Sequence, residues 1–397
     1  MSDLIRIRND IRRSVNEQIA RYPSIEDDQL RDVITEEVLA YEEEQVLSFS
    51  EKEQLIVSIY NSMRRLDILQ PFLDDDSISE IMINGPDHIF IERKGKMERI
   101  RQTFDNRETL ENLIQNIVTK VNRSVNETSP IVDARLQDGS RIAVVLPPVA
   151  LQGPIMTIRK FPDNPLTMED LTSENSLTQE AATFLKRLVQ SKYNIFISGG
   201  TSSGKTTFLN ILTNYIPSDE RIITIEDSAE LQIKNKENLI RLEARMDAGM
   251  GCEIAIRDLI KTALRLRPDR IIVGEVRGKE ALDMLQAMNT GHDGSLSTGH
   301  ANSAKDALKR LEVMAIEAGD IPLLSIKQQI ASAIEVVVQL CRMEDGKRRV
   351  LEISELLGLH QDEYETQPLF MYDIASQGLV ACAELQHRQK WQMHGGE

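Results

Sequence analysis

The sequence predicts an α/β protein with a mostly parallel sheet in its C-terminal part, a smaller mixed α/β domain before it and a helical segment at the N-terminus. From about residue 166 onward, buried-strand patterns alternate with amphipathic helices, and this alternation is typical of parallel sheets covered on both faces. At 397 residues the chain also exceeds one ordinary domain. We therefore expect three domains, over residues 1–67, 68–162 and 163–397.

Residues 1–67 are expected to form three helices. Apolar residues three and four positions apart make one stripe over the first: Leu4, Ile7, Ile11, Val15 and Ile19. Pro23 is expected to end that helix. Patterns typical of capping boxes begin at Ser24 and Ser50, before the second and third apolar stripes. The first helix is basic and the second acidic, which we interpret as two solvated faces rather than a membrane-binding helix.

The second domain combines strands with one amphipathic helix. Strand-like stretches cover residues 78–84, 88–92 and 141–146, with glycine-containing turns between them. Apolar residues from Leu110 to Val121 recur at helical spacing. The paired prolines of residues 161–165 then predict a linker.

The third domain carries the alternating pattern. Its expected strands cover residues 193–198, 221–226, 238–243, 270–275, 294–299, 335–342 and 348–356. Its expected helices cover residues 205–214, 254–266, 278–289 and 303–318. In such a sheet, ligands gather at the carboxyl ends of the strands.

Composition excludes several classes of protein. The chain has 63 Asp and Glu against 47 Lys and Arg, a net charge of −16, which weighs against a nucleic-acid-binding surface. Its three cysteines form no C-x-x-C pair, so a four-cysteine zinc module is not expected and a reduced, cytosolic chain is the simplest interpretation. No apolar run of about 18 residues predicts a transmembrane helix. We expect any membrane role to work through partners.

A glycine-rich turn between a strand and a helix is the most informative feature of the chain. It fits the pattern G-x-x-x-x-G-K-[ST] at every fixed position, and its expected phosphate-binding residues are Gly199, Gly200, Thr201, Ser202, Ser203, Gly204, Lys205, Thr206 and Thr207. Backbone N–H groups and the helix dipole of such a turn favour anions. Lys205 is expected to reach the β- and γ-phosphates, and the Thr206 hydroxyl to ligate Mg²⁺. The sequence therefore predicts a nucleoside triphosphate site.

Three further clusters follow strand ends of the same domain. In the first, Glu226 follows an apolar strand and is expected to hold Mg²⁺ through water or to orient a water molecule. Glu275 ends a strand of the Walker B form and is the expected catalytic carboxylate, because it can align or deprotonate the attacking water. Like Glu226, Glu275 is a candidate for holding Mg²⁺ through water. His300 follows a small-residue strand and is expected to sense the γ-phosphate through a hydrogen bond.

These four clusters, in this order and spacing, resemble the secretion-superfamily ATPases that power type II secretion, type IV pili and type IV secretion. The resemblance covers nearly the whole chain and is most specific over residues 264–278 and 280–292. Residues 133–141 and 157–161 look like the CpaF branch, which serves Tad/Flp (type IVc) pili. The family's names for the four clusters are Walker A, Asp box, Walker B and His box.

The resemblance implies a RecA-like P-loop domain, ATP and Mg²⁺ as cofactors, and a hexameric ring that works on inner-membrane platform proteins from the cytoplasmic face. Nucleic acid is not an expected partner, and no direct membrane insertion is expected. The resemblance also implies that arginines of the mixed α/β domain reach the γ-phosphate, and the matching positions are Arg135, Arg141 and Arg159. Turnover would move the domains about the linker.

The chain departs from the family pattern at two positions, and other functions stay open. Ser202 stands where glycine is more frequent, and Gly299 where a bulkier apolar residue is common; the loop of residues 246–252 also differs, so no arginine role is assigned there.

A type IV secretion or pilus-retraction motor would use the same chemistry. The alternative from another class is a nucleotide-binding scaffold or switch with little turnover. A nucleic-acid motor conflicts with the acidic charge.

Overall fold

The computed structural model describes residues 2–20, 25–41, 47–93, 95–136, 138–161, 165–245 and 253–394. The chain divides into two compact units, Met1–Asp163 and Asn164–Glu397. The expected capping residue Ser24, the helix end at Pro23, most of the proline linker and the loop 246–252 lie outside the described residues. The division of the first unit into two domains stays a prediction.

The first unit begins with three helices, α1 (Ser2–Ile19), α2 (Asp27–Ala40) and α3 (Phe49–Arg64). Their apolar stripes share one core, in which Ile7, Ile11 and Val15 are buried as expected. The capping box of α3 lies two residues before its expected place. Since α3 begins at Phe49, its N-cap residue is Ser48 and not Ser50. The Ser48 backbone N–H donates to the Glu51 carboxylate at 2.8 Å.

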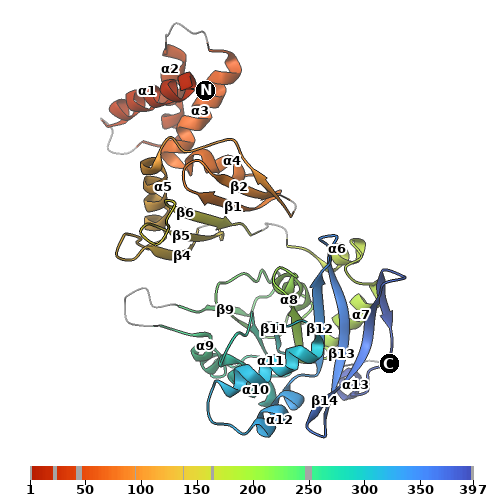
Figure 1. Ribbon diagram of the computed structural model, residues 1–397. Coiled ribbons are helices and arrows are strands. Elements are labelled where there is room, and N and C mark those ends of the chain that lie inside the picture. The colour runs from red at the N-terminus through yellow and green to blue at the C-terminus, as the bar shows by residue number, and fades with distance from the viewer. Residues whose placement is uncertain are drawn as a thin grey trace. The chain divides into compact units, whose positions relative to one another are not determined.

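A six-stranded antiparallel sheet completes the first unit (Figure 1). Its strands lie in the order β3-β2-β1-β6-β5-β4. Their bounds are β1 (Ile78–Asn84), β2 (Ile89–Arg93), β3 (Lys96–Arg99), β4 (Ile131–Arg135), β5 (Arg141–Val145) and β6 (Ile155–Arg159). The expected helix is α5 (Arg107–Lys120), and its buried face shares one core with the inward-facing strand residues. The sequence predictions missed β3, β4 and β6.

The second unit contains a nine-stranded sheet in the order β15-β14-β13-β12-β7-β11-β10-β8-β9. The strands from β12 to β9 are parallel, as expected, whereas β13, β14 and β15 are antiparallel additions. The parallel strands are β7 (Ile195–Gly199), β8 (Ile222–Glu226), β9 (Leu239–Glu243), β10 (Arg270–Val273), β11 (Leu296–His300) and β12 (Val336–Arg342). The others are β13 (Arg348–His360), β14 (Glu363–Asp373) and β15 (Gly378–Ala381).

Helices pack against both faces of this sheet and form two separate cores (Figure 1). One core contains α9 (Ile256–Ala263), α10 (Glu280–Asn289), α11 (Ala304–Ile316) and α12 (Leu323–Ala333). The other contains α6 (Met168–Ser173), α7 (Gln179–Gln190) and α8 (Lys205–Thr213). Among the described residues, no helix is both long enough and apolar enough to cross a bilayer.

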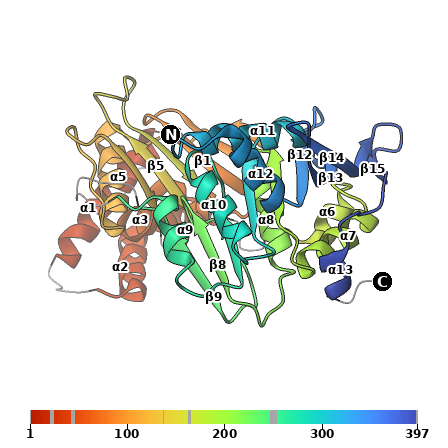
Figure 2. The ribbon, with the colours of Figure 1, turned by 90° about the horizontal axis from the view of Figure 1, so that it is seen from below.

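The C-terminal segment packs back onto α7 through α13 (Gln389–Met393), as Figure 2 shows from a second direction. The Trp391 ring centre lies 5.6 Å from that of Phe184. Lys390 Nζ lies 2.8 Å from Asp293 Oδ1 and 2.7 Å from Glu335 Oε2. Asp293 and Glu335 precede the parallel strands β11 and β12, so the segment is anchored at the amino end of the sheet.

Candidate nucleotide-binding site

The phosphate-binding loop connects β7 to α8 and requires two left-handed residues. Gly204 has φ +92° and Ser202 has φ +58°. Glycine adopts a positive φ most easily, which agrees with its frequency at the position of Ser202 in the family that the sequence resembles. A Cβ at Gly199 would lie 2.5 Å from Ser203 Oγ and 2.7 Å from the Leu340 carbonyl oxygen. Only glycine therefore fits where the loop leaves the strand.

Lys205 lies buried at the start of α8. Its Nζ donates to the carbonyl oxygens of Gly199 at 3.1 Å and Gly200 at 3.0 Å, and lies 3.3 Å from His300 Nδ1. Burial lowers the pKa of Lys205, while the charge of Glu275 opposes this effect. Because backbone carbonyls are weak substitutes for phosphate oxygens, the ammonium group is available to an anion in the loop.

Glu275 and His300 complete a chain of contacts that begins at Lys205. His300 Nε2 lies 2.7 Å from Glu275 Oε1, and the Arg277 guanidinium contacts Glu275 Oε2 at 2.7 and 3.0 Å. Burial and the Lys205 charge lower the pKa of His300, so its imidazole is neutral at pH 7. A neutral ring with its proton on Nε2 can accept from Lys205 through Nδ1, and its Nε2 lies beside the Glu275 carboxylate.

Glu226, the last residue of β8, is a buried carboxylate with one bound and one orphan oxygen. Its Oε1 accepts from the N–H groups of Glu230 and Leu231, both at 2.9 Å. Its Oε2 is buried without a hydrogen-bond partner among the described residues. Burial raises the pKa of Glu226 to about 7 against the two backbone hydrogen bonds. The Glu226 side chain lies close to the neighbouring motif, because a Cβ at Gly274 would lie 3.0 Å from Glu226 Cγ.

Strand order brings the four sequence clusters together. The strands β7, β11, β10 and β8 are consecutive in the sheet, and His300 pairs in register with Gly199. Glu226 and His300 are the last residues of their strands, and Glu275 follows two residues after β10. All four clusters therefore lie at the carboxyl edge of the sheet, as expected for a ligand site.

Several buried polar atoms of this region lack a partner among the described residues. They are Ser203 Oγ, Thr224 Oγ1, Glu226 Oε2, Glu275 Oε1 and Ser297 Oγ. A buried polar atom without a partner is costly, so such a group indicates a place for ligand or water. The described residues contain no cluster of three or more His, Cys, Asp or Glu side chains that could hold a metal. Thr206 is the second residue of α8, and its expected role as a Mg²⁺ ligand stays a prediction.

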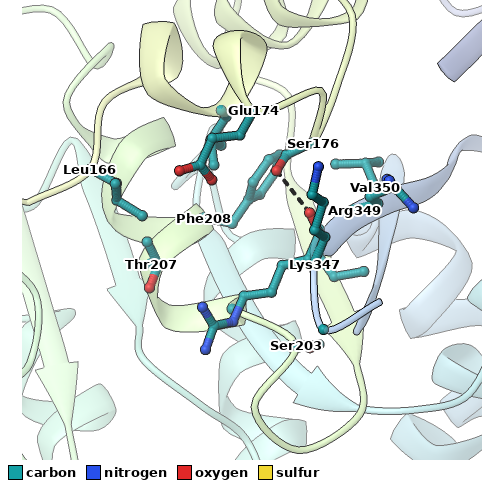
Figure 3. A pocket seen from close by; sticks show the side chains of 14 residues that line it. Leu166, Glu174, Ser176, Ser203, Thr207, Phe208, Lys347, Arg349 and Val350 are labelled. Carbon is teal, nitrogen blue, oxygen red and sulfur yellow. Dashed lines mark hydrogen bonds between the residues drawn. The ribbon is translucent and has the colours of Figure 1, made fainter. Parts of the chain in front are cut away.

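A pocket of about 350 Å³ adjoins the phosphate-binding loop (Figure 3). Gly204, Thr207 and Phe208 form the side that belongs to the loop and α8. The opposite side includes Glu174 and the β12–β13 turn, where Arg348 Nε donates to the Ser202 carbonyl oxygen at 3.1 Å. The sequence analysis missed this lining, because Glu174 and Arg348 belong to no motif and lie far from the loop along the chain.

The three expected arginines lie on neighbouring strands of the first unit. Arg135 pairs in register with Arg141, and Arg141 with Arg159, so they form one row across β4, β5 and β6. Each already has a neighbour. Arg141 makes a two-pronged ion pair with Asp133 at 2.6 and 3.1 Å, and Arg135 Cζ lies 5.8 Å from the Phe161 ring centre. Their role toward a nucleotide stays a prediction.

The unusual glycine before His300 also has a structural reason. A Cβ at Gly299 would lie 2.6 Å from Cζ of Phe196, a buried residue of the adjacent strand β7. The Phe196 ring fills the space that a side chain at residue 299 would need. The large Phe196 side chain therefore compensates for the missing side chain at residue 299.

The sheet order, the phosphate-binding loop and the carboxylates at adjacent strand ends define a P-loop protein with a RecA-like fold. Comparison with known proteins then identifies its family. The family model described as Type II/IV secretion system protein matches residues 63–390, and the chain belongs to this family.

Relatives and solved structures agree with this family. An uncharacterized protein of Methanocaldococcus jannaschii is 40% identical over 303 residues, which are 74% of this chain and 41% of that protein. This chain thus spans less than half of that relative. A putative conjugal transfer protein of Mycobacterium tuberculosis is 33% identical over 297 residues, 73% of this chain and 84% of that protein. The X-ray structure of the Legionella pneumophila ATPase DotB shares the fold, with a TM-score of 0.53, 21% identity and coverage of 72% of this chain and 79% of that one.

Proposed function

We propose that the protein is a hexameric, Mg²⁺-dependent ATPase that powers assembly of a Tad/Flp-type pilus. Membership of the Type II/IV secretion system protein family supports an ATPase of a secretion or pilus machine. The observation that carries the chemistry is the continuous contact from Lys205 through His300 to Glu275 beside a phosphate-binding loop. A protein that only bound nucleotide would not need a carboxylate held at this place.

The residues divide the reaction between them. Lys205 and the loop N–H groups bind the β- and γ-phosphates, and the pocket beside Phe208 takes the nucleoside. Mg²⁺, held by Thr206 and phosphate oxygens, would neutralise charge on the phosphates. Glu275 aligns the attacking water and accepts its proton, while Glu226 orients water or holds the metal through water. His300 donates a hydrogen bond that depends on the γ-phosphate.

The proposed assembly is a ring in which Arg135, Arg141 and Arg159 meet the γ-phosphate and offset the charge that develops there. The ring would act from the cytoplasmic side, at the inner face of the membrane, on platform proteins of the pilus. The chain's own formal net charge of −16 supports protein partners rather than nucleic acid. Residues 133–141 and 157–161 support the CpaF assignment.

Two alternatives remain distinct from this proposal. A type IV secretion or pilus-retraction ATPase would use the same site in another machine, and neighbouring genes for prepilins or for conjugation would separate the two. A nucleotide-dependent scaffold is the alternative from another class. It is favoured by the contacts of Arg277 with Glu275, because a carboxylate paired with a guanidinium is a weaker base toward water.

The first test is phosphate release from Mg-ATP across a range of protein concentrations, with Lys205→Ala as the blank. Turnover per chain that rises with concentration is expected, because hydrolysis then depends on an assembled ring. Nucleotide binding without turnover at every concentration, also with membranes that carry the platform proteins, would contradict the ATPase and favour the scaffold.

A further inference from the structure

The segment that follows Glu226 belongs to no sheet. Residues 229–234 have no regular secondary structure, and they lie between β8 and β9 along the chain. Four of their backbone N–H groups, at residues 230, 231, 232 and 234, donate to side-chain oxygen atoms. Three side chains supply these acceptors.

Three side chains accept four N–H groups of this segment. Glu226 Oε1 accepts from Glu230 and Leu231, both at 2.9 Å, Asn210 Oδ1 from Gln232 at 2.7 Å, and Asn214 Oδ1 from Lys234 at 3.1 Å. These bonds connect the segment to the end of β8 and to helix α8. The segment is thus held by Glu226 and the two asparagines together.

Both asparagines belong to the helix that starts at the phosphate-binding loop. Asn210 follows Thr206 by four residues, so it lies one helical turn beyond the expected Mg²⁺ ligand, and Asn214 caps the same helix. The Asn214 amide also donates to the Asn210 carbonyl oxygen at 2.9 Å, which links the two acceptors. Asn210 is buried, so its hydrogen bond is shielded from water.

We propose that Asn210 and Asn214 are positioning residues for Glu226. They tie the segment that holds the Glu226 carboxylate to helix α8, so that the carboxylate keeps a fixed place relative to Lys205 and Thr206. The inference rests on the proposed ATPase, because the position of Glu226 matters to turnover only if Glu226 orients water or metal. Neither asparagine contacts the phosphates in this scheme, and both act through the segment.

The decisive comparison is between variants that remove or keep the acceptor. Asn210→Leu and Asn214→Leu remove the oxygen that receives the backbone N–H, whereas Asn214→Asp keeps it at a half-exposed position. Thr213→Val is the matched control, because buried Thr213 donates only within α8, to the Asn210 carbonyl oxygen at 2.8 Å. Thermal unfolding of each variant shows which ones fold.

Two readouts are combined: amide hydrogen exchange of residues 230–234, and kcat and KM for ATP. Asn210→Leu is expected to speed exchange of the Glu230 and Leu231 amides, which report the Glu226 bonds. It is also expected to lower kcat roughly 10- to 100-fold with KM changed less than about threefold, since a small misplacement of a reacting group costs this much. Asn214→Leu should have a smaller effect in the same direction. Asn214→Asp and Thr213→Val should stay within about threefold of the wild type.

Other results would overturn the inference. A folded Asn210→Leu protein with unchanged exchange at Glu230 and Leu231 would show that the asparagine does not hold Glu226. Equal losses of kcat in Asn210→Leu and Thr213→Val would indicate general disturbance of α8. If the wild-type protein showed no turnover with its ring assembled, the proposed ATPase would fail, and the exchange pattern would still decide whether the tether exists.

Discussion

The two sheets of this protein present their charged residues in opposite ways. The antiparallel sheet of the first unit carries its arginine row on a solvent-accessible face, and Arg141 is paired with Asp133 there. The parallel sheet of the second unit buries polar groups at its carboxyl edge, and some of them, such as Glu226 Oε2 and Ser203 Oγ, have no hydrogen-bond partner within the described part of the chain.

The two regions therefore differ in how their polar groups contribute to stability. Exposed ion pairs contribute little to stability, so the arginines can exchange their partners at low cost. Buried orphan groups lower stability unless a ligand satisfies them. The proposed function therefore predicts different effects for changes in the two regions: loss of chemistry in the buried site, and loss of turnover without loss of binding at the arginine row.

The sharpest test of this contrast is Glu275→Gln in the buried site. ATP binding should be retained, because the loop and Lys205 are unchanged. Hydrolysis should fall at least about a thousandfold, since an amide cannot accept the proton of the attacking water. Nucleotide affinity by equilibrium titration and single-turnover phosphate release measure the two effects. Normal turnover in this variant would move the catalytic role to another carboxylate, with Glu226 as the first candidate.

Glu226→Gln tests how much free energy the burial of an ionised carboxylate costs at this position. Because burial raises the pKa of Glu226 from 4.5 to about 7, the folded state favours the protonated carboxyl. This contribution to stability is complete below pH 4.5 and is lost as the pH rises to about 7. The free energy of unfolding should fall by about 3 kcal/mol over this pH range because of Glu226. Glu226→Gln should abolish this pH dependence, since the amide does not titrate. Urea unfolding of both proteins at pH 5 and pH 7.5 measures the difference, and identical pH slopes would contradict a buried, protonated Glu226.

Arg135→Ala and Arg159→Ala test the exposed surface. Each is expected to lower turnover roughly a hundredfold and to change nucleotide affinity much less, because the charge acts mainly in the transition state. Arg99→Ala is the control, since Arg99 is an exposed arginine on β3 of the same sheet. Loss of nucleotide binding in the two variants would assign the arginines to the ground state instead. Equal effects in Arg99→Ala would remove their special role.

Trp391→Ala, at the far end of the parallel sheet, should have the smallest effect. Its ring packs against Phe184 and beneath the Arg187 guanidinium, whose Cζ lies 4.9 Å from the ring centre. The half-buried contact predicts a loss of about 1 to 2 kcal/mol in unfolding free energy. kcat and KM should not change, because the segment is anchored at the amino end of the strands. A large change in kcat would show that the two ends of the sheet are coupled.

Sequence patterns predicted the parallel sheet better than the antiparallel one. Strands such as β7 and β8 are buried along their whole length, so their apolar runs are continuous. In β4 and β6 only alternate residues face the core, and arginines and Asp133 occupy the outer face. Such short strands have too few apolar residues to stand out. The antiparallel additions β14 and β15 were missed for a similar reason.

The arrangement at the carboxyl edge of the parallel sheet was predictable because its residues follow strands within recognisable motifs. Glu226, Glu275 and His300 lie at or just after strand ends, and Lys205 begins the helix after the loop, as the sequence predicted. The pocket beside the loop and the two asparagines were not predictable. Glu174 and Arg348 line the same pocket although they lie far apart along the chain, and a hydrogen bond from Gln232 to Asn210 has no sequence signature.

The contact of Phe196 with Gly299 has an evolutionary consequence. The two residues occupy the same space between adjacent strands, so neither can gain volume unless the other loses it. Relatives with a branched side chain at the position of Gly299 should therefore carry a smaller residue at the position of Phe196. A larger side chain at residue 299 alone should displace His300. A larger side chain at residue 299 together with a smaller one at residue 196 should leave His300 in place. Residues 196 and 299 are thus expected to covary across the family, so that a substitution at one position is accompanied by a substitution at the other.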